Sequence, residues 1–146
     1  MNNFKDISVK PFIKWVGGKT QLLDEVKRSL PSDLGKRTGL TYVEPFVGGG
    51  AVLFWILQEY PNIERAVIND INAELICTYR VIKSNVEALI QELNRIQSEY
   101  ISMGADDRKE YFLSKRALFN SRNISDIETA ALFIFLNRTC FNGLYR

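Results

Sequence analysis

The spacing of apolar residues in the first half of the chain predicts strands and helices in alternation. The segment "TYVEPF", residues 41–46, is a short apolar run interrupted by Pro45 and predicts a buried strand. The segment "GGGAVLFWILQEY", residues 48–60, opens with glycines and continues as an apolar helix. A second strand, "RAVIND", residues 65–70, is followed by a helix over residues 72–83. This order predicts the first βαβ unit of a doubly wound parallel sheet.

Two helices are predicted in the second half of the chain. The segment "SNVE", Ser84 to Glu87, has the capping-box form S-x-x-E, and apolar residues at helical spacing follow it as far as Tyr100. A second capping box, "SDIE", residues 125–128, opens a helix through Asn137. Two identifiable parallel strands make a poor independent fold. Either further strands lie in segments that read as helix, or the chain is the front part of a longer protein.

Length and composition restrict the class of protein. The 146 residues suffice for about one domain, and 46% hydrophobic residues allow a packed core. The longest apolar run, residues 130–136, is far shorter than the ~20 residues that cross a bilayer. The N-terminus has no apolar stretch of the signal-peptide kind. We therefore expect no membrane association.

The cysteine and histidine content restricts the metal sites and catalytic groups that the chain can contain. Cys77 and Cys140 do not form a paired-cysteine motif, which argues against a disulfide framework or a zinc site and favours a reducing, cytoplasmic setting. The chain has no histidine, so histidine metal ligands, Ser-His-Asp triads and histidine general bases are excluded from it.

Charge is unevenly distributed along the chain, although the net value is only +2. Residues 1–40 carry a net +4, residues 41–107 a net −6, and residues 108–146 a net +4. Basic ends around an acidic middle are compatible with a polyanionic partner such as nucleic acid. A single lysine-rich helix face would give the same count, so charge alone leaves the partner open.

The segment "KWVGGKT", residues 14–20, ends like a Walker A phosphate loop. That loop requires a glycine five residues before Gly18, where this chain has Ile13. The segment also precedes the first predicted strand, whereas a phosphate loop follows one. Walker A is therefore rejected, and a glycine turn before the amphipathic "QLLDEVKRSL" helix remains.

The segment "EPFVGGG", residues 44–50, lies at the carboxyl end of the first predicted strand, where glycines let the backbone approach a ligand. The dinucleotide pattern G-x-G-x-x-G fits only in part, because Leu53 occupies the third glycine position. Asp70 ends the second strand, where an acid accepts hydrogen bonds from ribose hydroxyls. An adenosine-containing cofactor is favoured over the alternative of a tight turn with a solvated acid.

Glu44 discriminates among such cofactors. A carboxylate directly before the glycine turn would repel the pyrophosphate of NAD. It suits a cofactor with a positive group at that place, such as S-adenosylmethionine with its ammonium and sulfonium. The residues therefore favour S-adenosylmethionine over NAD.

The last segment, "NRTCFNGLYR", residues 137–146, contains the strong turn signal Asn142-Gly143. Aromatic, amide and guanidinium groups on a tight loop are suited to groove contacts and base stacking in DNA. A plain hairpin without a ligand is the alternative, and the segment alone favours that alternative.

Taken together, four blocks in this order resemble the Dam-type (D12 class) DNA adenine-N6 methyltransferases: "PFIKWVGGKTQLL", "YVEPFVGGGAVLF", "VINDINAELICTYRVIK" and "FLNRTCFNGLYR". The resemblance implies an α/β fold, with an incomplete Rossmann-like methyltransferase sheet and a helical DNA-recognition region. It implies residues 1–83 as the N-terminal part of the cofactor-binding domain. Residues 84–146 would form the helical target-recognition region, ending in a DNA-contacting hairpin.

The resemblance also implies site residues. For S-adenosylmethionine these are Trp15, Gly17, Gly18, Lys19, Glu44, Phe46, Gly48, Gly50 and Asp70. For double-stranded DNA they are Lys14, Arg138, Asn142, Gly143, Leu144, Tyr145 and Arg146. Leu144 and Arg146 match base-contact positions, and the family's substrate is adenine N6, commonly within GATC.

The family's catalytic motif, Asp-Pro-Pro-Tyr, is absent from this sequence, because none of its four prolines is adjacent to another. In relatives that motif comes after the hairpin. We therefore name no catalytic residue and no metal site, and expect the chain alone to be inactive. A non-catalytic DNA-binding remnant or regulator, and less favourably an NAD-type oxidoreductase fragment, remain alternatives. The sequence also leaves open a role in restriction–modification or in repair.

Overall fold

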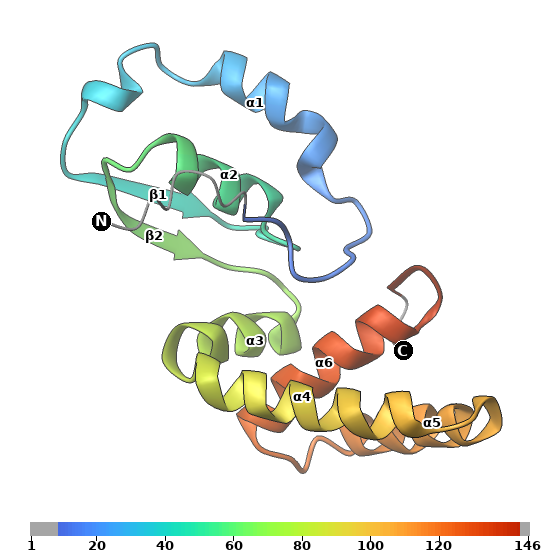
Figure 1. Cartoon of the computed structure of the whole chain (residues 1–146). Helices are drawn as coiled ribbons and strands as arrows, with labels where there is room; N and C mark the ends of the chain where they lie inside the picture. Colours follow the sequence, from blue (N-terminus) through green and yellow to red (C-terminus); the bar gives the residue numbers. More distant parts are fainter. Residues whose placement is uncertain (1–8, 144–146) are drawn as a thin grey trace. The chain divides into compact units, whose positions relative to one another are not determined.

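The computed structural model describes residues 9–143, which belong to two compact units that meet in sequence at Ile71 and Asn72. Both strands lie in the first unit, and the second unit is helical (Figure 1). The predicted α/β class is confirmed in this form, as a mixed structure with a small parallel sheet. No helix in the described part of the chain is long and apolar enough to cross a membrane.

The first unit is built around two parallel strands. Its elements in chain order are the 3-10 turn η2 (Lys19–Leu22), α1 (Leu23–Ser29), η3 (Leu34–Lys36), β1 (Leu40–Glu44), α2 (Ala51–Glu59) and β2 (Ile63–Ile68). Val43 pairs with Val67 in the parallel register. The predicted βαβ unit is therefore confirmed. β1 ends at Glu44, directly before Pro45, because proline has no N–H to donate to a ladder.

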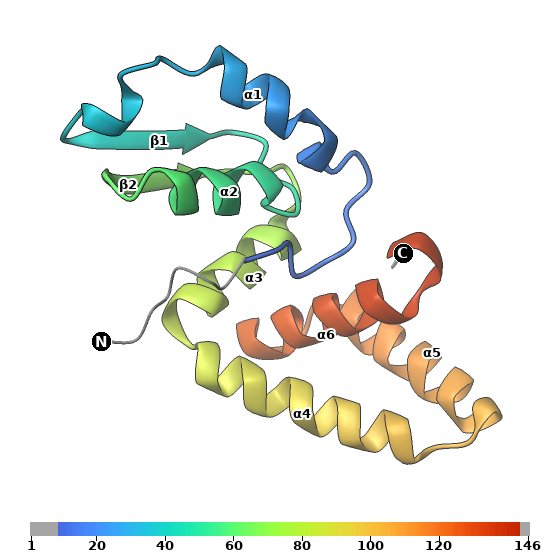
Figure 2. The same ribbon diagram turned by 45° about the horizontal axis from the view of Figure 1, so that its top comes forward.

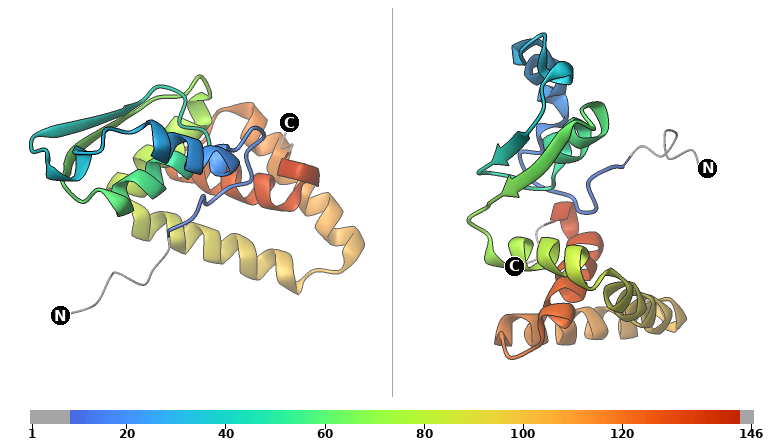
Figure 3. Two further views of the ribbon diagram at one scale, coloured as in Figure 1. Left: turned by 90° about the horizontal axis from the view of Figure 1, so that it is seen from above. Right: turned by 90° about the vertical axis from the view of Figure 1, so that its left-hand side faces the viewer.

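Among the described residues of the first unit, one side of the sheet is covered by a helix and the other is left exposed. α2 lies on one side of the two strands (Figure 3, right), and it buries Val52, Leu53 and Ile56. On the strands, Val43 is 59% exposed and its partner Val67 is 39% exposed. Side chains alternate between the two faces of a strand, so these valines mark the face that α2 does not cover.

The second unit is a group of helices with α6 at its centre. Its elements are α3 (Ala73–Ser84), α4 (Val86–Ser102), α5 (Ala105–Ser121), α6 (Asp126–Thr139) and the 3-10 turn η4 (Phe141–Gly143). α6 packs against α3, α4 and α5 (Figure 2). Residues 130–136 of this helix are all apolar, and Ala130, Phe133 and Leu136 are fully buried. A helix that is apolar on every side belongs in a core.

Of the two predicted capping boxes, one is confirmed and one is wrong. Ser125 accepts a hydrogen bond from the Glu128 backbone N–H, and the Glu128 carboxylate accepts one from the Ser125 backbone N–H. Ser84, in contrast, is the last residue of α3, and its hydroxyl donates to the carbonyl of Arg80. The N-cap of α4 is Asn85, and no side chain caps that end.

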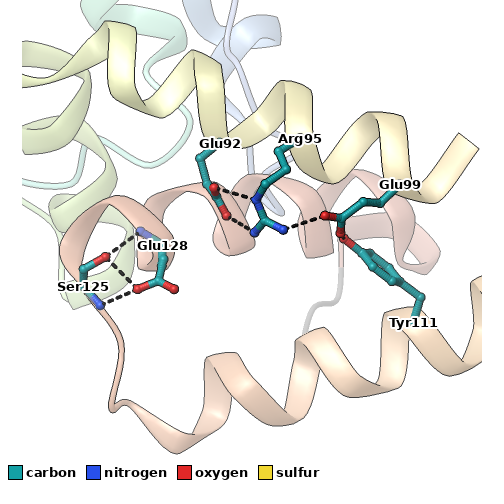
Figure 4. Close-up of polar contacts among 6 residues, drawn as sticks. All are labelled: Glu92, Arg95, Glu99, Tyr111, Ser125 and Glu128. Atoms are coloured by element: carbon teal, nitrogen blue, oxygen red, sulfur yellow. Dashed lines mark hydrogen bonds and ion pairs between the residues drawn. The ribbon is translucent and has the colours of Figure 1, made fainter.

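A polar network joins α4 to α5 (Figure 4). The Arg95 guanidinium pairs with Glu92 and Glu99 on its own helix, and Tyr111 of α5 donates to Glu99 over 2.6 Å. The hydrogen bond from Tyr111 is the main reason why the pKa of Glu99 is lowered. Arg108 of α5 donates to the carbonyls of Tyr100 and Ile101 at the end of α4. These bonds fix the hairpin between the two helices.

The two compact units do not coincide with the predicted domains. Because α3 packs against α6, residues 72–83 belong to the second unit by packing, whereas the sequence places them with the cofactor-binding domain. A unit defined by packing need not be a unit of function. The predicted functional boundary at residue 83 therefore stays a prediction.

Candidate cofactor site

The segment that ends like a phosphate loop forms a tight turn at one wall of a cavity. Gly17 has φ +74° and Gly18 donates from its N–H to the carbonyl of Trp15 over 3.1 Å. η2 begins at the next residue, Lys19. Trp15 before the turn and Lys19 after it both line the cavity.

The opposite wall is the glycine turn between β1 and α2. Gly48 has φ +51°, in the left-handed region that favours glycine. A Cβ at Gly48 would lie 2.8 Å from Cδ1 of Trp15, and one at Gly49 would lie 3.3 Å from the Trp15 Cβ. The absence of side chains at these two positions lets the indole ring lie directly on the turn.

Asp70 connects the end of β2 to the glycine turn. Its Oδ2 accepts a hydrogen bond from the Gly48 N–H at 3.0 Å. Next to it, the Val47 N–H donates to the Asn69 carbonyl and the Asn69 N–H donates to the Glu44 carbonyl, each at 2.9 Å. The two strand ends are therefore held side by side, as the carboxyl ends of neighbouring parallel strands should be.

Glu44 is buried, with 6% of its surface exposed, and both of its carboxylate oxygens are bonded. Lys19 Nζ donates to Oε1 over 3.1 Å and also to the Phe46 carbonyl. Tyr42 donates from its hydroxyl to Oε2 over 2.8 Å. Burial first, and the contact with Glu44 second, raise the pKa of Tyr42. The structure therefore places a lysine of this chain where the sequence suggested a positive group of a cofactor.

These walls enclose a cavity of about 340 Å³ within the first unit. Seven of the nine predicted cofactor residues line it: Trp15, Gly17, Gly18, Lys19, Phe46, Gly48 and Asp70. The two others do not line it. Glu44 lies behind Lys19, and Gly50 is the N-cap of α2 with φ +83°.

Further lining residues were not anticipated from the sequence. They include Pro11 and Ile13, which precede the glycine turn of "KWVGGKT", and Val47 and Gly49 in the second turn. Ile13 is buried, at 4% exposed. The one available signal was the position of Pro11 and Ile13 inside the block "PFIKWVGGKTQLL".

The predicted DNA-binding residues are divided between the two units. Lys14 is exposed in the first unit, and Arg138 is exposed in the last turn of α6 in the second unit. Asn142 and Gly143 belong to η4, a 3-10 turn, and no strand is formed there within the described residues. Leu144, Tyr145 and Arg146 lie outside the described residues, so the predicted hairpin stays a prediction.

Comparison with known protein families identifies the fold family. Residues 15–146 match the family of D12 class N6 adenine-specific DNA methyltransferases. The chain belongs to this family. The resemblance inferred from four sequence blocks is thereby confirmed over nearly the whole chain.

Several curated proteins are similar to this chain. The type II methyltransferase M.MjaIII of Methanocaldococcus jannaschii is 45% identical over 142 residues, 96% of this chain and 49% of that protein. A DNA adenine methylase of Haemophilus influenzae is 37% identical over 139 residues, 94% of this chain and 43% of that protein. The chain therefore spans about half the length, or less, of these relatives.

Proposed function

We propose that this chain supplies the S-adenosylmethionine pocket and part of the DNA contact surface of a D12 class methyltransferase that modifies adenine N6 in double-stranded DNA. The supporting observation is the cavity itself. Two sequence-distant glycine turns and Asp70, two residues after the end of β2, converge on about 340 Å³ of space. Ligand pockets commonly fall between ~300 and ~1,000 Å³, so this space is in the range for a small cofactor.

The residues of the cavity fit the chemistry of that cofactor. The Trp15 ring, which lies against the backbone at Gly48, offers a flat surface against which a planar base can lie. Asp70 offers a carboxylate for ribose hydroxyls beside that surface. When bound, S-adenosylmethionine supplies a methyl group on an electrophilic sulfonium. The chain's contribution is to bind and orient this molecule and to limit the access of water.

Lys19 is the residue we assign to the methionine end of the cofactor. An ammonium has three N–H donors, and two of those on Lys19 serve Glu44 and the Phe46 carbonyl. The third is available to pair with a carboxylate in the cavity. Glu44 then acts through Lys19, by holding its ammonium at the wall, rather than by direct contact with the cofactor. This changes the role suggested for Glu44 by the sequence.

For the DNA contact we assign Lys14 and Arg138, together with the segment from Phe141 to Arg146. Guanidinium and ammonium groups bind phosphates without reading sequence, whereas bidentate arginine contacts in the major groove read guanine. We propose a GATC-like target site, on the similarity to Dam-type enzymes. Within residues 1–146 no Asp-Pro-Pro-Tyr segment occurs, so we expect binding without methyl transfer from this chain alone.

Calorimetric titration of the purified 146-residue chain tests the cofactor assignment. Circular dichroism first establishes that the helices are formed. The folded chain should bind S-adenosylmethionine with measurable heat and should bind NAD at least ten-fold more weakly. A folded chain that shows equal affinity for both, or no heat with S-adenosylmethionine, would contradict the proposal. Transfer of tritiated methyl to a GATC duplex by the chain alone would contradict the expected inactivity.

A further inference from the structure

Tyr42 has a contact that neither the family resemblance nor the cavity lining assigns to it. It stands two residues before Glu44 in β1, so both side chains lie on the same face of the strand. Its hydroxyl donates to Oε2 of Glu44 over 2.8 Å, while Oε1 accepts from Lys19 over 3.1 Å. The buried carboxylate is therefore held from two sides, by a phenol and by an ammonium.

The two sides differ in their relation to the cavity. Lys19 lines the cavity, whereas Tyr42 and Glu44 do not. The three side chains form a row of hydrogen bonds from Tyr42 through Glu44 to Lys19, and of these only Lys19 lines the cavity. A buried carboxylate oxygen without a donor is costly, so loss of the phenol hydroxyl would favour a different Glu44 rotamer. Lys19 would then lose the acceptor that fixes its ammonium at the wall.

We propose that Tyr42 is a positioning residue of the cofactor pocket, which holds Glu44 so that Lys19 keeps its ammonium aimed into the cavity. The proposal rests on the function proposed above for Lys19. The raised pKa of Tyr42 agrees with it, because the phenol remains a hydrogen-bond donor at neutral and moderately alkaline pH. Phenylalanine at this position would keep the ring and its packing and would remove only the donor.

A double-mutant cycle on the full chain tests the proposal. The four proteins are the unchanged chain, Tyr42→Phe, Lys19→Met and the double variant, and the measurement is calorimetric affinity for S-adenosylmethionine. Tyr42→Phe should weaken binding about 5- to 10-fold, within the range for the net loss of one typical intramolecular hydrogen bond. In the Lys19→Met background the same change should weaken binding less than 2-fold, because Tyr42 acts through Lys19.

The control is Tyr60→Phe, which removes a hydroxyl from a half-buried tyrosine of the same unit that packs on Trp55 outside the cavity. It should leave affinity unchanged. Equal affinity of Tyr42→Phe and the unchanged chain would overturn the proposal. So would an equal loss in both Lys19 backgrounds, since that outcome describes a purely structural tyrosine.

Thermal unfolding of the same four proteins without cofactor separates this proposal from the proposed function. If Tyr42 positions Glu44 for Lys19, the two substitutions should be non-additive in melting temperature whatever ligand the cavity takes. A folded chain that fails to bind S-adenosylmethionine, yet shows this coupling, would reject the cofactor assignment and retain the Tyr42–Glu44–Lys19 relation. Additive melting temperatures would overturn that relation.

Discussion

Gly48 lies against the indole ring of Trp15 so closely that a Cβ on the glycine would stand 2.8 Å from Cδ1 of the ring. The two residues are 33 positions apart in the sequence, and each belongs to a different glycine turn. Their contact joins the two turns into one pocket. The shape of the pocket therefore depends on the absence of a side chain as much as on the residues that are present.

Gly48→Ala should accordingly destabilise the chain and reduce cofactor binding. The left-handed φ of +51° and the clash with Trp15 both oppose a methyl group, and together they should cost about 1–3 kcal/mol of unfolding free energy. Gly35→Ala is the matched control, because its Cβ would meet nothing within 4 Å and its φ is not positive. Urea unfolding measures the free energy of unfolding of both variants. An equal loss for Gly48→Ala and Gly35→Ala would show that the contact with Trp15 is not tight.

The two predicted capping boxes provide a second pair of matched substitutions. Ser125→Ala removes the N-cap of the central helix and should cost about 1 kcal/mol. Ser84→Ala, at the box that the structure does not form, removes only a hydroxyl that bonds to the preceding turn and should change stability by less than about 0.5 kcal/mol. Chemical denaturation distinguishes them. A larger loss of unfolding free energy for Ser84→Ala than for Ser125→Ala would indicate that Ser84 does cap a helix.

The βαβ unit could be predicted because buried strands and glycine turns have local sequence signals. Contacts between residues that are far apart in the sequence have no such signal. The ion pair between Lys19 and Glu44 spans 25 residues, so a positive group near Glu44 could be inferred while its source could not. At Ser84 two cap-forming residues are adjacent, and α3 continues through Ser84, so that Asn85 takes the N-cap position of α4. No separate helix is predicted over the residues of α5, because its apolar residues do not form a clear stripe.

Acidification should lower the folding stability of the second unit, because Glu128 becomes protonated. The cap hydrogen bonds from Ser125 lower the pKa of this carboxyl below its ordinary 4.5. A lowered pKa in the folded state stabilises the fold above pH 4.5, and this contribution is lost as pH falls through the lowered value. Glu128→Gln and Ser125→Ala should both reduce the slope of melting temperature against pH below 4.5. Curves parallel to that of the unchanged chain would exclude the cap as its source.

The open face of the sheet predicts a contrast between two valines of the first unit. Val52→Thr places a hydroxyl at a site that is 7% exposed and should cost about 1–3 kcal/mol. Val43→Thr is the same change at a site that is 59% exposed and should cost less than about 0.5 kcal/mol. Urea unfolding of the chain measures both. A large cost for Val43→Thr would mean that this face is covered in solution.

Arg138 provides the test of the DNA contact. It is exposed in the last turn of α6, and we expect its guanidinium to bind a phosphate. Arg138→Ala should therefore weaken binding of GATC and scrambled duplexes by the same factor and should reduce the salt-dependence slope by about one. Arg28→Ala, which removes an exposed charge paired with Glu25 on α1, is the control for net charge. Fluorescence anisotropy at several salt concentrations measures these effects. A loss of affinity confined to the GATC duplex would instead make Arg138 a base-reading residue. An equal loss of affinity for Arg28→Ala would mean that both substitutions act only through the net charge of the chain.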